Sequence, residues 1–175
     1  MQTEAWLRGP LDGIDPLLMP AAHALVQAAT DIEQAAQNLT VQELWSRPGG
    51  AASVGFHLRH VAGSIDRLFT YARGEQLTAE QHQALALEAI PGEAPAEANA
   101  LTREVLARIE DALEVVRLTP TETLFEPRAV GRALLPTNVF GLIFHIAEHT
   151  QRHTGQIVTT AKIVRSLKTQ DGALA

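Results

Sequence analysis

The feature that most constrains the fold is an apolar residue that recurs every seven positions near the N-terminus. These residues are Leu18, Leu25, Ile32 and Leu39, and alanines occupy the other inward position of each repeat. A seven-residue repeat forms a continuous seam along one face of a helix. Such a seam must be buried against other helices, because a single helix would leave it in water. The segment therefore predicts a helical bundle whose first long helix covers about residues 15–39.

Three further segments carry apolar residues at intervals of three and four, which places them on one face of a helix. These segments cover about residues 53–73, 96–118 and 136–167. Thr78 and Gln81 have the spacing of a capping box, which predicts a short helix between the second and third long ones. No segment alternates apolar and polar residues as a half-buried strand would, although a short extended piece fits within residues 119–135. We therefore expect an all-α fold over residues 1–175, a single-domain four-helix bundle with a long, partly helical crossover between helices two and three.

Composition narrows the classes of function. Apolar residues make up 46% of the 175 residues, which is enough for a core and argues against disorder. Cysteine is absent, which excludes disulfides, Cys-ligated zinc, iron–sulfur clusters and a cysteine nucleophile. The formal net charge is −6 and the basic residues form no block, so nucleic acid is not an expected partner. No apolar stretch approaches the roughly 18 residues of a membrane span. The first ten residues do not resemble a signal peptide, so we expect a cytoplasmic protein that does not contact a membrane.

The last predicted helix carries three of the seven histidines at four-residue intervals, His145, His149 and His153. Imidazoles at i and i+4 lie on one face, one turn apart, and can ligate the same ion. All three cannot do so, because the rise from His145 to His153 is about 12 Å. At 100° per residue, His149 and His153 fall within the apolar stripe, whereas His145 falls at its edge. Two inward imidazoles need partners, which a shared metal ion or separate hydrogen bonds could supply.

The second predicted helix offers a third ligand, either His57 or His60. The same arithmetic of 100° per residue slightly favours His57 as the inward ring. Either ring, together with the pair on the last helix, would make a three-His site with one open position, as in catalytic zinc sites. Histidine ligands also suit nickel, iron or copper, so the ligand set alone does not select the metal.

Two motifs in the chain resemble those of the DinB/YfiT-like superfamily of small bacterial four-helix-bundle proteins. The first runs from Ser53 to His60 and is followed by Asp66, and the second runs from His149 to Gln156 with the pattern H-x3-H-x-G-Q. The resemblance covers nearly the whole chain. It implies an up-down-down-up order of helices, a homodimer and a divalent metal ion, with zinc or nickel common in similar proteins.

The resemblance also implies which histidine of the second helix ligates the metal. In the family this residue lies about seven positions after the serine that opens the helix, and here that position is His60. The resemblance therefore selects His60, His149 and His153 as the metal ligands. His57, which the helical wheel favours, is the alternative.

Some relatives transfer low-molecular-weight thiols such as bacillithiol or mycothiol. The resemblance therefore implies a metal-dependent thiol S-transferase or hydrolase that acts on a small electrophilic molecule, with that molecule or a thiol as partner. Gln156, one turn beyond His153, could orient a ligand, and Asp66 could orient a ligand histidine through its second ring nitrogen. The alternative is a non-catalytic metal-binding or stress-response protein in which the ion is structural or sensory.

Overall fold

The computed structural model describes residues 3–172, which form six α-helices, three short 3-10 turns and one two-stranded antiparallel sheet. The long helices are α1 (Met19–Ala36), α3 (Val54–Ala72), α5 (Ala98–Leu118) and α6 (Val139–Gly172). The shorter elements are α2 (Val41–Trp45), α4 (Ala79–Leu87), β1 (Pro127–Val130) and β2 (Leu135–Asn138). The expectation of a mostly helical fold is confirmed, and the small sheet is an addition to it.

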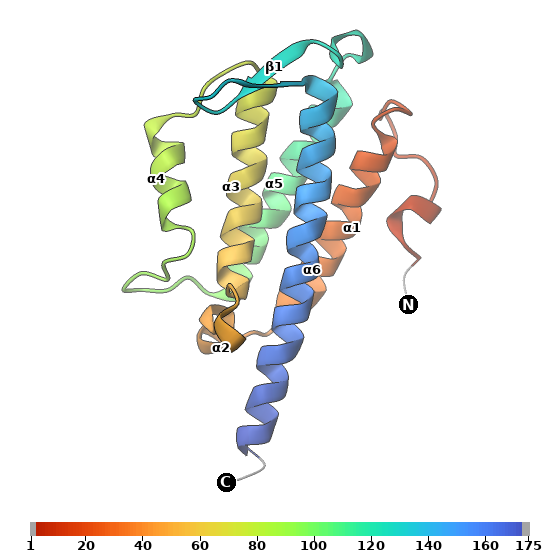
Figure 1. Ribbon diagram of the computed structural model, residues 1–175. Coiled ribbons are helices and arrows are strands. Elements are labelled where there is room, and N and C mark those ends of the chain that lie inside the picture. The colour runs from red at the N-terminus through yellow and green to blue at the C-terminus, as the bar shows by residue number, and fades with distance from the viewer. Residues whose placement is uncertain (1–2, 173–175) are drawn as a thin grey trace.

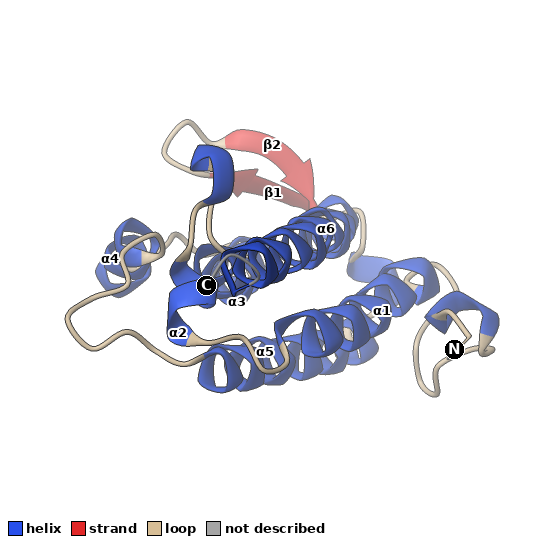
Figure 2. Cartoon of the chain, turned by 90° about the horizontal axis from the view of Figure 1, so that it is seen from below, coloured by secondary structure: helices blue, strands red, loops and turns tan. Residues whose placement is uncertain are grey.

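The four long helices lie side by side (Figure 1). Helix α6 packs against α1 and α3, and α5 packs against the same two helices, so the apolar core lies between all four. In the view of Figure 1, α1 and α6 run downward, whereas α3 and α5 run upward. Helix α4 lies outside the four long helices, on the side of α3 (Figures 1 and 2). Among the helices of residues 3–172, none combines the length and the apolarity needed to cross a membrane.

Helix α1 is shorter than predicted at both ends. Before it, the Asp15 carboxylate accepts a hydrogen bond from the backbone N–H of Leu17 and holds a turn. Pro20 lies in the first turn of the helix, where its missing N–H costs nothing. At the other end Asn38 adopts the left-handed conformation, with φ of +60°, and the helix stops before it. Leu39 is nevertheless buried, so the last residue of the heptad seam still packs into the core.

Helix α3 matches its predicted limits closely. The Ser53 hydroxyl accepts a hydrogen bond from the backbone N–H of Phe56 at 3.1 Å and caps the first turn. Gly74, with φ of +80°, follows the last turn in a conformation that glycine adopts without strain. The limits were predictable because both signals are local in sequence.

A β-hairpin displaces the start of α6 from its predicted position. Pro136, predicted as the first helical residue, instead lies in β2 and is paired with Ala129 of β1. The helix begins after Asn138, whose side-chain oxygen accepts a hydrogen bond from the backbone N–H of Gly141 at 2.7 Å. At its other end α6 continues past the predicted limit, to Gly172.

Leu25→Ala is predicted to lower the free energy of unfolding by about 2–5 kcal/mol, because it removes a fully buried side chain from the core. Leu118→Ala is the matched control, since this leucine lies at the end of α5 with 69% of its surface exposed. The control is expected to change the free energy of unfolding by less than about 0.5 kcal/mol. Urea unfolding followed by circular dichroism measures both. Equal losses in the two variants would contradict this assignment of the core.

Candidate metal centre

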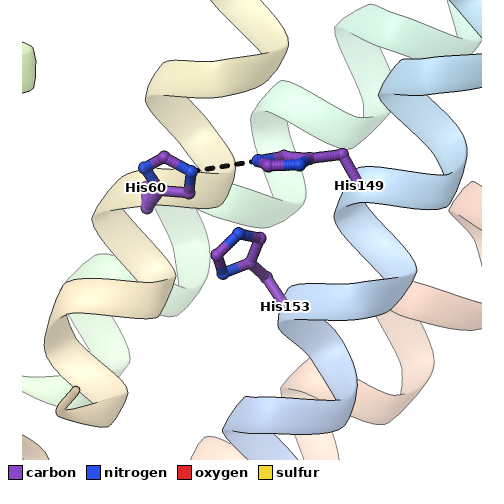
Figure 3. A group of neighbouring side chains, drawn as sticks. All are labelled: His60, His149 and His153. Atoms are coloured by element: carbon purple, nitrogen blue, oxygen red, sulfur yellow. Dashed lines mark hydrogen bonds between the residues drawn. The ribbon is translucent and has the colours of Figure 1, made fainter. Parts of the chain in front are cut away.

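Three imidazole rings meet between α3 and α6 (Figure 3). His60 extends from α3, while His149 and His153 extend from successive turns of α6. One ring nitrogen from each residue lies within 4.8 Å of the other two. The ring centroid of His153 lies 4.5 Å from those of both other rings, and the centroids of His60 and His149 are 5.2 Å apart. This three-His group is compatible with binding a metal ion.

The apolar stripe of α6 accounts for the position of two of the rings. Ile146 and Ile157 are almost completely buried on this stripe. His149 and His153 interrupt the stripe between them and are half-buried against α3. The periodicity that builds the core therefore also directs these two rings at the neighbouring helix.

Packing on α3 holds the third ring. The ring of Phe56, one turn before His60, stacks on the imidazole with a centroid distance of 5.3 Å and an angle of 19° between the planes. One face of the His60 ring is thus covered by an apolar surface, while its edge carries the two nitrogens. Stacking of this kind restricts the orientations open to the ring.

Hydrogen bonding within the group leaves one buried nitrogen without a partner among the described residues. Nε2 of His60 lies 3.0 Å from Nε2 of His149, and a hydrogen bond between them requires a proton on one of the two atoms. Nδ1 of His149 is buried and has no hydrogen-bond partner among the described residues. Because an unpartnered buried polar atom is costly, protein groups alone do not fully satisfy this ring.

The surroundings disfavour protonation of the rings. Burial, and to a smaller extent the neighbouring His60, lowers the pKa of His149 from 6.5 to about 4. Burial and then His60 act in the same way on His153, whose pKa falls to about 3. Both rings are therefore neutral near pH 7. The neutral imidazole is the form that ligates metals, because its lone pair is free.

His57 lies beside the three-His group. Its ring is buried, and its Nδ1 lies 2.9 Å from Nδ1 of His153. Burial, with a smaller effect of His60, lowers the pKa of His57 to about 4. The structure thus places His60 within the three-His group, and it places His57, which the helical wheel favoured, outside the group and in contact with His153.

A carboxylate that sequence reasoning did not identify contacts the group from outside the four long helices. Oε2 of Glu88, the residue after α4, lies 2.6 Å from Nδ1 of His60. Its other oxygen accepts a hydrogen bond from Arg67 at 2.8 Å. Glu88 is separated from His60 by 28 positions, so no motif spacing connects the two. The only available signal is that Glu88 is the one charged residue in the otherwise apolar run 84–90.

A comparison with known protein families agrees with the resemblance seen in the two histidine motifs of the sequence. The model of the DinB superfamily matches residues 24–157, which is most of the chain and includes every histidine of the cluster. The chain belongs to the DinB superfamily. A comparison with curated proteins finds no match.

The other site candidates of this DinB-superfamily chain are not members of the three-His group. The carboxylate of Asp66 accepts a hydrogen bond from Gln81 of α4 at 2.7 Å and is not the acid that contacts His60. Gln156 is exposed on α6, one turn after His153. His145 lies at the edge of the cluster and forms a hydrogen bond with Glu148 at 2.7 Å.

Metal-free protein is predicted to lose stability as the pH falls from about 6.5 to about 4. The histidines of the unfolded chain bind protons near pH 6.5, whereas His149 and His153 in the folded chain stay neutral until their pKa values of about 4 and about 3 are approached. The unfolded state therefore binds more protons in this range, and the free energy of unfolding falls. Chemical denaturation of chelator-treated protein at several pH values measures the slope.

A matched pair of variants assigns this slope to the cluster. His153→Asn is expected to flatten it, because one depressed pKa is removed. His82→Asn, at an exposed position on α4, is expected to leave it unchanged. The same slope in both variants would show that the pH dependence arises elsewhere.

Proposed function

We propose that this DinB-superfamily chain binds one divalent metal ion, zinc or nickel, through His60, His149 and His153. The observation that carries the proposal is the meeting of three imidazoles from two helices, with one nitrogen of each within 4.8 Å of the others. The proposal includes the arrangement of the four long helices as an up-down-down-up bundle that brings α3 beside α6. A cytoplasmic homodimer remains a prediction, and light scattering during size-exclusion chromatography would test the dimer.

The donor set suits such an ion. Three imidazole nitrogens are suitable ligands for zinc and nickel. Because the set contains no thiolate, it differs from a cysteine-rich structural zinc site. The lowered pKa values of His149 and His153 leave their lone pairs free near neutral pH.

Three protein ligands leave one coordination position for a substrate. When bound, a divalent ion supplies a Lewis acid that lowers the pKa of a water molecule or a thiol. We propose on this basis a metal-dependent thiol S-transferase or hydrolase that acts on a small electrophilic molecule, with a low-molecular-weight thiol as co-substrate in the first case. Gln156, exposed one turn after His153, could orient such a substrate by hydrogen bonding.

A non-catalytic role is the second candidate, and the origin of the ligands favours it. His60 belongs to α3 and the other two histidines belong to α6, which packs directly against α3. A bound ion would therefore link two core helices, and it could act as a structural or sensory ion in a stress response. This role does not require a position open to substrate.

The two candidates differ in whether an added thiol can reach the ion. Protein loaded with Co²⁺ would gain a thiolate-to-cobalt charge-transfer band when a small thiol is added, if one position is open. Transfer of the thiol to chlorodinitrobenzene, lost in His153→Ala, would support the transferase. An unchanged spectrum at saturating thiol, with no transfer, would support the non-catalytic role.

Metal content is predicted to be roughly one divalent ion per chain, and His153→Ala is predicted to lose it because two imidazoles remain. Elemental mass spectrometry on untagged protein, purified without nickel resin, measures the content. His82→Ala controls for loss of a histidine that lies outside the cluster and is expected to retain the ion. An absence of metal in wild-type protein, even after incubation with Zn²⁺ and Ni²⁺, would refute the proposal.

The two histidines of α3 are predicted to differ in their effect on metal binding. His60→Ala should abolish stoichiometric binding, because it removes a member of the three-His group. His57→Ala should retain roughly one ion per chain, because His57 is not a member of the three-His group and contacts it through Nδ1 of His153. Titration with Zn²⁺ against a chelating dye compares the two. The opposite ranking would make His57 the ligand from α3.

A further inference from the structure

Glu88 makes two short contacts that together determine which nitrogen of His60 carries the proton. One carboxylate oxygen lies 2.6 Å from Nδ1 of His60, and the other accepts a hydrogen bond from Arg67 at 2.8 Å. An ionised carboxylate only accepts hydrogen bonds, so Nδ1 of His60 must donate the proton. The lone pair of the neutral ring then lies on Nε2, the atom that faces His149 at 3.0 Å.

The Glu88 carboxylate is buried together with Arg67, and Gly63 leaves space for both. Glu88 is 5% exposed and Arg67 is 7% exposed, so both charges are buried and depend on each other. Gly63, inside α3, leaves the space that the pair occupies. A Cβ atom at this position would lie 2.6 Å from the Arg67 guanidinium and 2.7 Å from the Glu88 carboxylate. A glycine in the middle of a helix is unfavourable, and here it allows the ion pair to lie against the helix backbone.

The segment that carries Glu88 is held in place by polar contacts. We call residues 75–97, between α3 and α5, the crossover arm. Helix α4 within the arm buries none of its residues, so apolar packing does not explain its position. Gln81 donates hydrogen bonds to Asp66 and Thr70 of α3. Arg59 of α3 donates to the backbone carbonyl of Ile90 at 2.5 Å.

These contacts lie on both sides of Glu88 along the arm. The Gln81 contacts precede it and the Ile90 contact follows it, while Arg59 is itself held over the ring of Trp45, 4.6 Å from its centroid. The arm is therefore fixed to α3 at two points, and the single buried acid between them meets His60. The polar contacts of the arm thus have the common effect of bringing one carboxylate to one ring.

We propose that Glu88 is a positioning residue, which the crossover arm delivers to His60 to fix the Nδ1–H form of that ring with Nε2 directed into the three-His group. By fixing this form, Glu88 raises the affinity of the group for a divalent cation, and this second statement rests on the proposed function. Partners of this kind behind a metal-ligating histidine typically change metal affinity by roughly 10- to 100-fold.

Two variants test the role of Glu88, and a third is the matched control. Glu88→Gln keeps the size of the side chain but removes its charge and one acceptor. Glu88→Leu combined with Arg67→Met replaces the buried ion pair with apolar groups, which keeps the fold from carrying an unpaired charge. Glu93→Gln removes an exposed acid from the same arm and is the control.

The first measurement uses metal-free protein, so that it does not depend on the proposed function. Long-range ¹H–¹⁵N spectra of the histidine side chains report which ring nitrogen is protonated. The expected result is a proton on Nδ1 of His60 in wild type and Glu93→Gln, and a mixture of both forms in the double variant. A proton on Nε2 in wild type, or an unchanged Nδ1–H form in the double variant, would overturn the proposal. A merely structural role would lower stability without changing this signal.

The second measurement is the dissociation constant for Zn²⁺, by competition with a chelating dye. The double variant should bind roughly 10- to 100-fold more weakly than wild type, Glu88→Gln by an intermediate factor, and Glu93→Gln equally well. An unchanged constant in the double variant would overturn the effect on affinity. If wild type binds no Zn²⁺, the proposed function fails, and the spectra of the metal-free protein still decide whether Glu88 positions His60.

Discussion

The contact between α3 and α6 has to accommodate imidazole rings where apolar side chains would ordinarily pack, and much of the structure depends on this. His149 and His153 occupy positions on α6 that its periodicity assigns to the core. Each ring carries two nitrogens that need partners once water is removed. Helix α3 supplies one partner for each ring, because His60 lies 3.0 Å from His149 and His57 lies 2.9 Å from His153. The imidazoles are thereby gathered at one place, in an arrangement that is compatible with binding a metal ion.

Features set by one helix were predictable from the sequence. The inward direction of His149 and His153 follows from the apolar stripe of α6 alone, and the limits of α3 follow from a serine cap and a glycine stop. The choice between His57 and His60 does not follow in this way. Helix α3 packs against both α5 and α6, so its apolar stripe gives the mean direction of two contacts and not the edge that meets α6. His57 lies near that mean direction and is buried, while His60 lies at the edge and joins the group. The family resemblance, and not the periodicity of the helix, selected His60, and its role as a metal ligand remains a prediction.

The pairing of the hairpin strands and the contact made by Glu88 were not predicted from the sequence. Each strand of the hairpin has four residues, which is too short for an alternating pattern to be recognised, and each contains a proline. Pro136 was therefore interpreted as the start of a helix, although its strand partner is Ala129. Glu88 was missed for a different reason. Its importance arises only when the crossover arm folds back on α3, and nothing in the local sequence indicates which acid of the arm will meet a histidine.

The crossover arm also shows how a polar cluster can order a segment that the hydrophobic effect does not hold. Helix α4 buries none of its residues, yet Glu88, just after it, is 5% exposed. An unpaired carboxylate at such a depth would be costly, so the arm is stable in this position only while Arg67 and His60 remain as partners. Hydrogen bonds in a chain polarise one another, so a cation that draws on the lone pair of His60 would strengthen the donation from Nδ1 to Glu88. The order of the arm and the occupancy of the three-His group are then linked through a single imidazole ring. This linkage gives a physical reason why polar contacts on α3, and not apolar packing, fix the crossover arm. Apolar packing would hold the arm equally well whether or not the three-His group binds a cation.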